Sequence, residues 1–216
     1  MADVVRSTGE PITLRDIILY SATGKPSQKY DTVTLSSEAH KDAAGSYIIK
    51  TQDGWVAHYA GSKERLPSLP LLYAVIEKLH EEKNPATAQL LKELKDSWLC
   101  TSTRIDYGRN IITHDYGRET TGFRGDIPKG SHWLKDITGN KEWNNTLQVL
   151  LMCKDVDKAQ EVLGGFAGVP PYIWTADDRK SNPLRAAFVD VSTDRLSLDC
   201  SYNIGGRGCS RSVASE

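Results

Sequence analysis

The sequence has little cysteine and no long hydrophobic run. Its four cysteines are too few and too scattered to indicate a disulfide framework. Its longest apolar runs, Ile17–Tyr20 and Leu71–Ile76, are far shorter than the roughly 20 residues that a membrane-spanning helix needs. The N-terminal residues also lack the apolar core of a secretory signal. We therefore expect a soluble, cytoplasmic protein with reduced thiols and no membrane partner.

An excess of charge of one sign is also missing. The 27 Lys and Arg residues nearly balance the 28 Asp and Glu residues, which leaves a net charge of -1. This balance argues against electrostatic binding of nucleic acid by the domain as a whole, so we expect no nucleic-acid partner. With 39% hydrophobic and 25% charged residues, the composition excludes disordered and fibrous classes. The length of 216 residues fits a single compact domain.

Sequence motifs that would fix a chemistry are absent. The P-loop, the dinucleotide-binding G-x-G-x-x-G, the zinc helix H-E-x-x-H, the G-x-S-x-G elbow and the EF-hand loop do not occur. Eight residues separate Cys200 from Cys209, which matches no zinc spacing. Arg207 and Arg211 flank Cys209 and would lower the pKa of its thiol, but no partner base can be named. We expect no metal and no cofactor.

Alternating hydrophobicity predicts an N-terminal sheet over about residues 10–60. Residues 12–20 fit a strand or a short helix, and residues 30–35 fit a strand. Residues 46–59 resemble a hairpin that turns at Gln52-Asp53-Gly54.

A helical period then predicts an αα-hairpin over about residues 68–99. Ser68 is a suitable N-cap for the first helix, and Asn84-Pro85 would end that helix and start the second. The apolar stripe of the second helix comprises Ala86, Leu90, Leu91, Leu94 and Trp98.

The C-terminal part, residues 146–202, combines helix and strand patterns. Residues 146–163 fit either one helix or a strand followed by a helix, with Gly164-Gly165 as the C-cap. Residues 172–175 fit a strand, residues 185–200 fit a hairpin, and the tail 203–216 is expected to be irregular. The fold prediction is a single α+β domain, with a mostly antiparallel sheet, a central αα-hairpin and a third short helix.

The segment 101–135 is rich in glycine, arginine and aromatic residues, and it is the predicted ligand-binding region. Guanidinium and hydroxyl groups bind phosphate or carboxylate, and glycine lets the backbone approach a ligand closely. Two alternatives are a solvated loop and a surface ion pair between Arg104 and Asp106. The candidate ligand-binding residues are Thr103, Arg104, Arg118, Arg124 and Trp133.

Two histidines of the same segment, His114 and His132, are candidate general bases because imidazole titrates near neutrality. Asp115 is a third catalytic candidate, but neighbours on a strand point to opposite faces, so Asp106, His132 or Asp126 would be a better partner for His114. A buried, hydrogen-bonded structural role is the alternative for His114.

Two functions remain open. In the first, the protein binds an anionic small molecule, phosphate- or nucleotide-like, or a protein partner through segment 101–135. In the second, it is a metal-independent hydrolase or transferase with a histidine base and an arginine anion clamp. The first needs fewer coincidences, but the sequence does not decide whether the protein is an enzyme, nor its ligand or oligomeric state.

Overall fold

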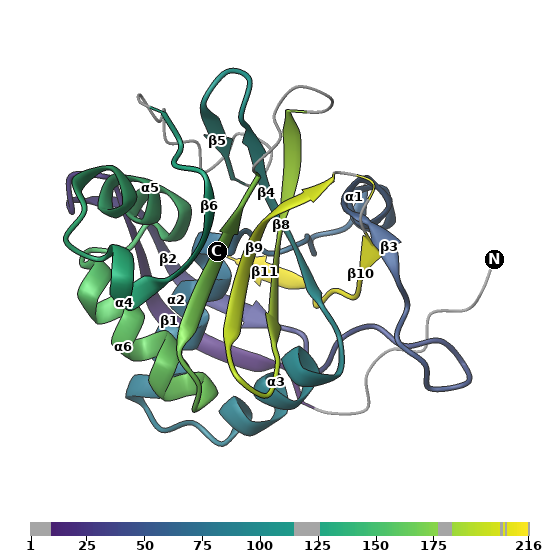
Figure 1. The fold of residues 1–216 in the computed structure, drawn as a ribbon. Helices are drawn as coiled ribbons and strands as arrows, with labels where there is room; N and C mark the ends of the chain where they lie inside the picture. The colour runs from purple at the N-terminus through teal and green to yellow at the C-terminus, as the bar shows by residue number, and fades with distance from the viewer. Residues whose placement is uncertain (1–9, 115–125, 177–182, 204, 206, 216) are drawn as a thin grey trace.

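The fold is a mixed α+β domain in which two sheets enclose a buried helix (Figure 1). The computed structural model describes residues 10–114, 126–176, 183–203, 205 and 207–215. Within these residues the strands form a six-stranded, a three-stranded and a two-stranded sheet. The α+β class predicted from the sequence is confirmed.

The six-stranded sheet has the order β5-β4-β8-β9-β7-β6. All neighbours in it are antiparallel except β7 and β9. The hairpin predicted over residues 185–200 is present as β8–β9, and the strand predicted over residues 172–175 is present as β7. Strands β4 and β5 pair as a further hairpin. The strands are β4 (Leu99–Asp106), β5 (Ile111–Thr113), β6 (Gly130–Trp133), β7 (Pro171–Thr175), β8 (Leu184–Val191) and β9 (Leu196–Asn203).

The N-terminal strands β1 (Ile12–Tyr20) and β2 (Pro26–Leu35) form an antiparallel pair. Residues 12–20 are thus a strand, one of the two predicted alternatives. The edge of β2 pairs with β11 (Val213–Ser215), which comes from the C-terminal tail. This sheet lies behind the six-stranded sheet in Figure 1.

Helix α2 (Leu69–Glu81) lies between these two sheets, where it contacts β1 and β4 as well as three further helices. Every residue from Leu69 to Ile76 is buried, as expected for a helix that is hydrophobic on all sides. Ser68 caps it as predicted, because its hydroxyl accepts a hydrogen bond from the amide of Leu71 at 3.2 Å.

Helix α3 (Ala86–Asp96) follows α2 along the chain. Its buried apolar residues are Leu90 and Leu94, whereas Leu91 is half-buried and Trp98, beyond the helix, is 40% exposed. The predicted stripe is therefore narrower than expected.

Residues 146–163 adopt neither predicted alternative. They belong to two helices, α5 (Lys141–Leu151) and α6 (Val156–Ala167), and a short helix α4 (Leu134–Ile137) precedes them. Met152, in the left-handed conformation, ends α5. The predicted cap at Gly164-Gly165 is wrong, because α6 continues to Ala167 and Gly168 is its left-handed C-cap.

The predicted hairpin over residues 46–59 is also wrong. Only β3 (Lys50–Thr51) is a strand, and helix α1 (Gln52–Tyr59) follows it directly. The Thr51 hydroxyl accepts a hydrogen bond from the Gly54 amide at 3.0 Å, and Asp53 lies in the first helical turn. These are helix-start features, so the apparent turn is the beginning of a helix.

The tail beyond β9 is not irregular. It contains β10 (Arg207–Gly208), which pairs with β3, and then β11. Between these two strands the residues Cys209, Ser210, Arg211 and Ser212 are all buried. Small side chains and glycine, which suggest a loop, here allow the tail to pass through the interior.

None of the helices in the described residues is both apolar enough and long enough to span a bilayer.

Candidate active site

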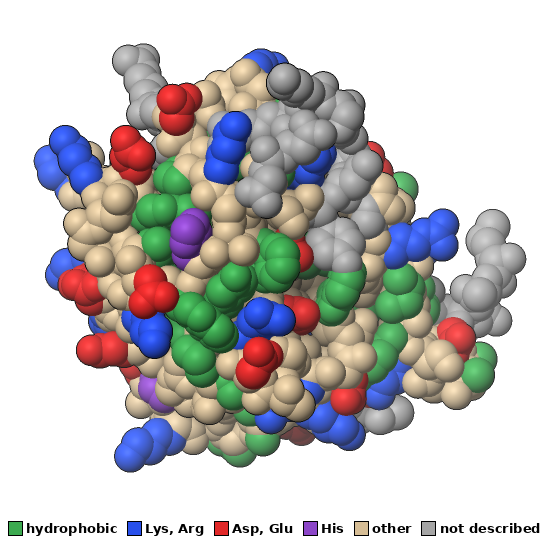
Figure 2. Space-filling model, viewed as in Figure 1, with side chains coloured by type: hydrophobic (Ala, Val, Ile, Leu, Met, Phe, Trp, Pro, Cys, Tyr) green, Lys and Arg blue, Asp and Glu red, His purple; other side chains and the backbone are tan. Residues whose placement is uncertain are grey.

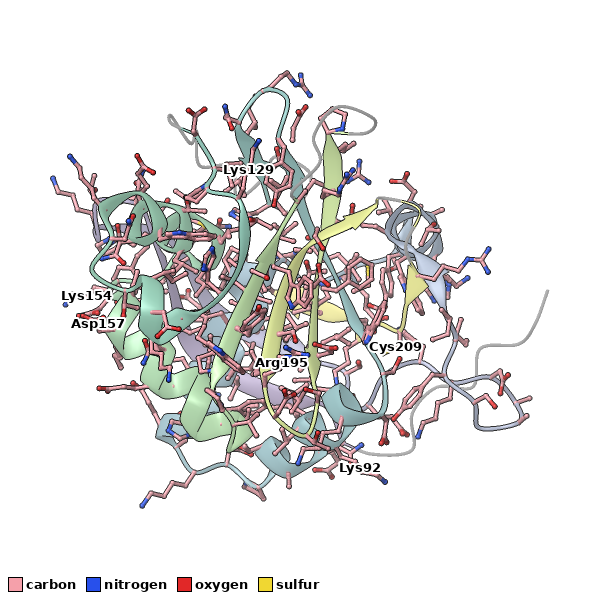
Figure 3. The ribbon with its side chains drawn as sticks, in the orientation of Figure 1. Lys92, Lys129, Lys154, Asp157, Arg195 and Cys209 are labelled. Atoms are coloured by element: carbon pink, nitrogen blue, oxygen red, sulfur yellow. The ribbon has the colours of Figure 1, made fainter. Side chains whose placement is uncertain are left out.

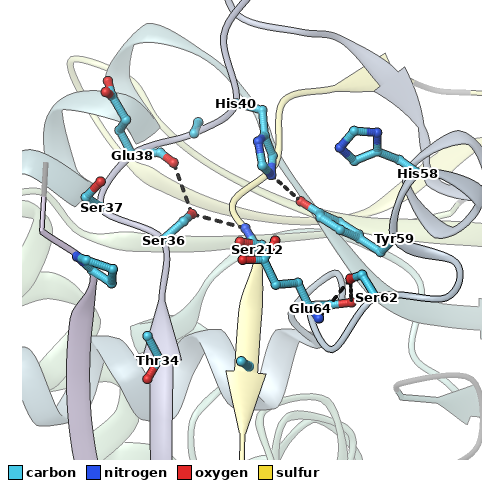
Figure 4. A pocket seen from close by; sticks show the side chains of 13 residues that line it. Thr34, Ser36, Ser37, Glu38, His40, His58, Tyr59, Ser62, Glu64 and Ser212 are labelled. Carbon is cyan, nitrogen blue, oxygen red and sulfur yellow. Dashed lines mark hydrogen bonds between the residues drawn. The ribbon is translucent and has the colours of Figure 1, made fainter. Parts of the chain in front are cut away.

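A pocket of about 430 Å³ opens where four separate chain segments meet (Figure 4). One wall is the segment that follows β2, another is the end of α1, and the others are the loop after α1 and the tail around β11. We call it the His40 pocket. The polar side chains that line it are Thr34, Ser36, Ser37, Glu38, His40, His58, Tyr59, Ser62, Glu64 and Ser212.

The C-terminal tail holds the first wall in place. The amide of Ser36 donates to the carbonyl of Ser212 at 2.9 Å, and the amide of His40 donates to the carbonyl of Ser210 at 3.0 Å. The amide of Ser212 in turn donates to the Ser36 hydroxyl at 3.1 Å. These contacts fix the backbone from which the His40 side chain projects.

Helix α1 supplies the facing wall. Trp55 and Tyr59 lie one helical turn apart and are buried, and His58 lies beside them at the helix end. The Trp55 indole donates to the carbonyl of Gly208 at 2.8 Å, which ties α1 to β10. The burial of one helix face thus brings His58 and Tyr59 to the pocket.

The two pocket histidines are neighbours. The rings of His40 and His58 have centroids 5.4 Å apart in an edge-to-face arrangement. The His40 ring also stacks on Trp55 at 5.5 Å, and its Nε2 is 2.8 Å from the hydroxyl of Tyr59. Figure 4 shows both imidazoles and the phenol at one side of the pocket.

Their surroundings keep both imidazoles uncharged near neutrality. Burial lowers the pKa of His40, and the neighbouring His58 and Lys50 lower it further. Burial and Lys50 likewise lower the pKa of His58, while Glu64 opposes this shift at both rings. Burial raises the pKa of Tyr59, so the phenol keeps its proton.

These groups suit proton transfer. A neutral imidazole has one nitrogen that donates and one that accepts a hydrogen bond, so it can remove a proton from a substrate at pH 7. The nearby Glu64 carboxylate would stabilise the imidazolium that forms. Glu38, the other carboxylate of the pocket, is already bound to Lys41 at 2.6 Å.

The histidine predicted as a base, His114, lies elsewhere and is completely buried. Its Nε2 is 2.9 Å from the carbonyl of Val149, and its Nδ1 is 2.9 Å from the hydroxyl of Thr103. A carbonyl only accepts, so Nε2 carries the proton and the Thr103 hydroxyl donates to Nδ1. Burial lowers the pKa of His114 to about 4.

The other predicted ligand residues are dispersed. Arg104 binds the side chains of Gln52 and Asp53 at the start of α1, not Asp106. Asp106 binds Arg109 instead, at 2.6 Å. The structure therefore does not bring Arg104 and His114 together in one pocket.

His132 and Trp133 lie on β6, at the opposite end of the six-stranded sheet from β4 and β5. The His132 ring contacts Trp143 of α5, whereas the Trp133 ring contacts Tyr172. The remaining candidates, Asp115, Arg118 and Arg124, lie outside the described residues.

The four cysteines, Cys100, Cys153, Cys200 and Cys209, are buried and unpaired. Burial raises the pKa of Cys209 to about 11 despite the nearby guanidinium of Arg211, which is the opposite of an activated thiolate. Among the described residues, no three His, Cys, Asp or Glu side chains are grouped in a way that could hold a metal ion.

Sequence reasoning missed the His40 pocket. His58-Tyr59 lay in a segment interpreted as a strand, and His40 lies in a connection without a motif. The sequence feature that could have predicted α1 is Thr51, a residue type that commonly caps helix N-termini. In the structure its hydroxyl accepts a hydrogen bond from the Gly54 amide.

Comparison of the chain with protein-family models, curated proteins and solved structures finds no match.

Proposed function

We propose that the protein is a metal-independent hydrolase or transferase that works by general acid–base catalysis in the His40 pocket. One observation carries this proposal. Two imidazoles of lowered pKa have ring centroids 5.4 Å apart at the same pocket, and one of them is hydrogen-bonded to a phenol. The enzyme class is the one considered from the sequence, with different histidines.

In this proposal His58 is the general base. It is less buried than His40 and lines the pocket, and its lowered pKa leaves it unprotonated near pH 7. Glu64 stabilises the charged ring after it has taken a proton from water or from a substrate hydroxyl.

His40 and Tyr59 act as a hydrogen-bonded pair. Tyr59 retains its proton and holds His40 through the 2.8 Å contact, so the His40 ring has a fixed orientation toward the substrate. His58 takes the proton of the attacking water or substrate hydroxyl and then returns that proton to the leaving group, while the neutral His40 stays a hydrogen-bonding group toward the substrate, so a bond can be cleaved without a charged nucleophile on the protein.

The pocket lining indicates a small polar substrate. Its volume of about 430 Å³ is in the lower part of the usual range for ligand pockets, roughly 300–1,000 Å³. Serine and threonine hydroxyls supply hydrogen bonds, and the carboxylates of Glu38 and Glu64 disfavour a strongly anionic group in their part of the pocket.

A panel of chromogenic substrates tests the proposal: p-nitrophenyl acetate, butyrate, phosphate and glycosides, with bis-p-nitrophenyl phosphate. We expect turnover of at least one ester in the presence of EDTA. The variant His58→Gln should lower kcat/KM by about a hundredfold or more, and His40→Gln and Tyr59→Phe should also lower it. His132→Gln, outside the pocket, is the matched control and should leave turnover unchanged.

The pH profile gives a second readout. His58 must lose its proton to act as a base, and its pKa lies below the usual 6.5. We therefore expect kcat/KM to rise with pH and to level off below neutrality, with a limb that disappears in His58→Gln. A panel without turnover, or turnover that survives His58→Gln, would refute the proposal.

The alternative function, a binding or accessory role for segment 101–135, is favoured by one observation. Trp133 is half-buried on the outer face of the sheet, beside two other aromatic side chains, Tyr172 and Trp174.

A further inference from the structure

A cluster of aromatic side chains lies on the outer face of the six-stranded sheet, at the β6–β7 end. Trp133 of β6 and Tyr172 of β7 are direct partners in the register, with ring centroids 4.8 Å apart. Tyr172 and Trp174 are 5.7 Å apart, and Trp174 is 37% exposed. We call Trp133, Tyr172 and Trp174 the aromatic surface.

The strand pattern explains why these three side chains share a face. Residues of β7 alternate between buried and exposed, so Tyr172 and Trp174 point outward while Ile173 points into the core. Figure 2 shows hydrophobic side chains gathered on this face, with charged side chains beside them. Exposed aromatic side chains in a group usually mark a binding surface.

Polar groups border the aromatic surface on β8 and β9. Ser197 is the register partner of Tyr172, and Asp190 is the partner of Ser197. Asp199 is the partner of Trp174. One carboxylate oxygen of Asp190, Oδ1, is buried and has no hydrogen-bond partner among the described residues. Hydrogen-bond acceptors therefore lie next to the rings.

Arg195 occupies the position that a cationic ligand would take. Its guanidinium is 5.2 Å from the ring centroid of Tyr172 and 6.0 Å from that of Trp174. Figure 3 shows Arg195 in the lower part of the sheet, where it directly precedes β9. The arginine also lies 3.7 Å from Asp194, and its charge acts on Asp190. The positive charge of this guanidinium would repel a cationic ligand, whereas it does not repel a neutral one.

An anion fits no better. The carboxylates of Asp190 and Asp194 lie close to Arg195, and Asp199 is the register partner of Trp174, so a phosphate backbone would meet carboxylates along this border. This excludes the single-stranded nucleic acid that a row of aromatic rings would otherwise suit.

We infer that the aromatic surface binds a neutral carbohydrate chain. The apolar C–H face of a sugar ring packs on an exposed indole, and sugar hydroxyls donate to carboxylates and accept from a guanidinium. Asp190 and Arg195 then supply hydrogen bonds at the border of the surface, and Trp174 supplies the main stacking face. This site is separate from the His40 pocket and does not depend on the proposed catalysis.

Tryptophan fluorescence titration with cello-, xylo-, manno-, malto- and chitohexaose tests this inference. We expect at least one hexasaccharide to bind, and Trp174→Ala to weaken its binding by roughly tenfold or more. Asp190→Asn should also weaken it. Ile49→Ala is the matched control, because Ile49 is a comparably exposed hydrophobic residue, 44% exposed. This variant should bind the hexasaccharide with unchanged affinity.

Thermal melting of each variant separates loss of binding from loss of fold, and Trp133→Ala is the second variant if Trp174→Ala fails to fold. Titrations with oligo(dT) and with tetramethylammonium test the two rival ligand classes. The inference fails if no hexasaccharide binds, if binding survives both tryptophan variants, or if oligo(dT) or tetramethylammonium binds in place of the sugars.

Discussion

The guanidinium of Arg211 and the carboxylate of Glu93 meet at 2.6 Å in the interior of the protein, with side chains only 0% and 1% exposed. Glu93 belongs to α3, and its other oxygen accepts from Gln89 at 2.9 Å. Arg211 belongs to the tail and also donates to the carbonyl of Ser36 at 2.5 Å. One ion pair thus connects a helix, the tail and a wall of the His40 pocket.

Breaking this pair should destabilise the fold strongly. Glu93→Gln leaves a buried guanidinium without its counter-charge, and we expect a loss of about 3–5 kcal/mol in the free energy of unfolding. Urea denaturation measures it. Glu82→Gln, which removes an exposed partner of Lys78, is the control and should change stability by less than about 1 kcal/mol. Similar small losses in both variants would contradict the buried pair.

His114 should make stability depend on pH. Its folded pKa of about 4 is below the 6.5 of an exposed histidine, so the unfolded chain takes up a proton first. The stabilisation is complete above pH 6.5 and is lost as the pH falls toward 4, with a total of about 3 kcal/mol. Thermal melts between pH 7 and pH 4 should show this loss.

The matched comparison is between His114→Ala and His132→Ala. His114 is sealed between Thr103 and Val149, so its removal leaves a cavity and two unpaired polar groups. We expect a much lower melting temperature for His114→Ala than for His132→Ala. Between pH 7 and pH 4, the His114→Ala variant should also lose less stability than the unaltered protein does. Equal melting temperatures for the two variants would refute a structural role for His114.

Two adjacent leucines of α3 should respond differently to truncation. Leu90 is completely buried, so Leu90→Ala should cost about 2–5 kcal/mol by leaving a cavity. Leu91 only packs against the core from a half-buried position, so Leu91→Ala should cost clearly less. Chemical denaturation of the two variants measures the difference, and a reversed order would contradict the position of α3.

Gly208 should not tolerate a side chain. A Cβ there would lie 2.7 Å from the carbonyl oxygen of Trp98 and 2.9 Å from the ring of Phe188. We expect Gly208→Ala to cost about 1–3 kcal/mol through overpacking. Gly164→Ala is the control, because its nearest neighbour is 3.6 Å away and alanine favours the helix interior. Melting temperatures compare the two, and a stable Gly208→Ala variant would contradict the path of the tail.

Local patterns predicted the parts of the fold that depend on local interactions. The β8–β9 hairpin follows from alternation on both sides of a short turn, and α2 follows from a hydrophobic run behind Ser68. The prediction for residues 46–59 was wrong because their alternating hydrophobicity resembles that of a strand. In the structure the N-cap at Thr51 starts a helix there. The prediction of an irregular tail was wrong because glycine and serine usually indicate a surface loop.

The candidate site could not be predicted in the same way. His40 and Tyr59 are 19 residues apart, and Ser212 joins them only through the tail. Nothing in the local sequence around His40 indicates that it will face His58. Conversely, the sequence around Thr103 and His114 suggested a reactive site, but burial gives both residues a structural role.

The pairing of β2 with β11 also constrains how the protein is made. Val213 is the register partner of Leu35, so the N-terminal sheet cannot be completed until the ribosome has released a segment synthesised nearly 180 residues later. Until then the edge of β2 lacks its pairing partner, and it is a surface on which a chaperone can act. Because Ser212 and Ala214 line the His40 pocket, the walls of this pocket also come together only after the segment around β11 has been synthesised.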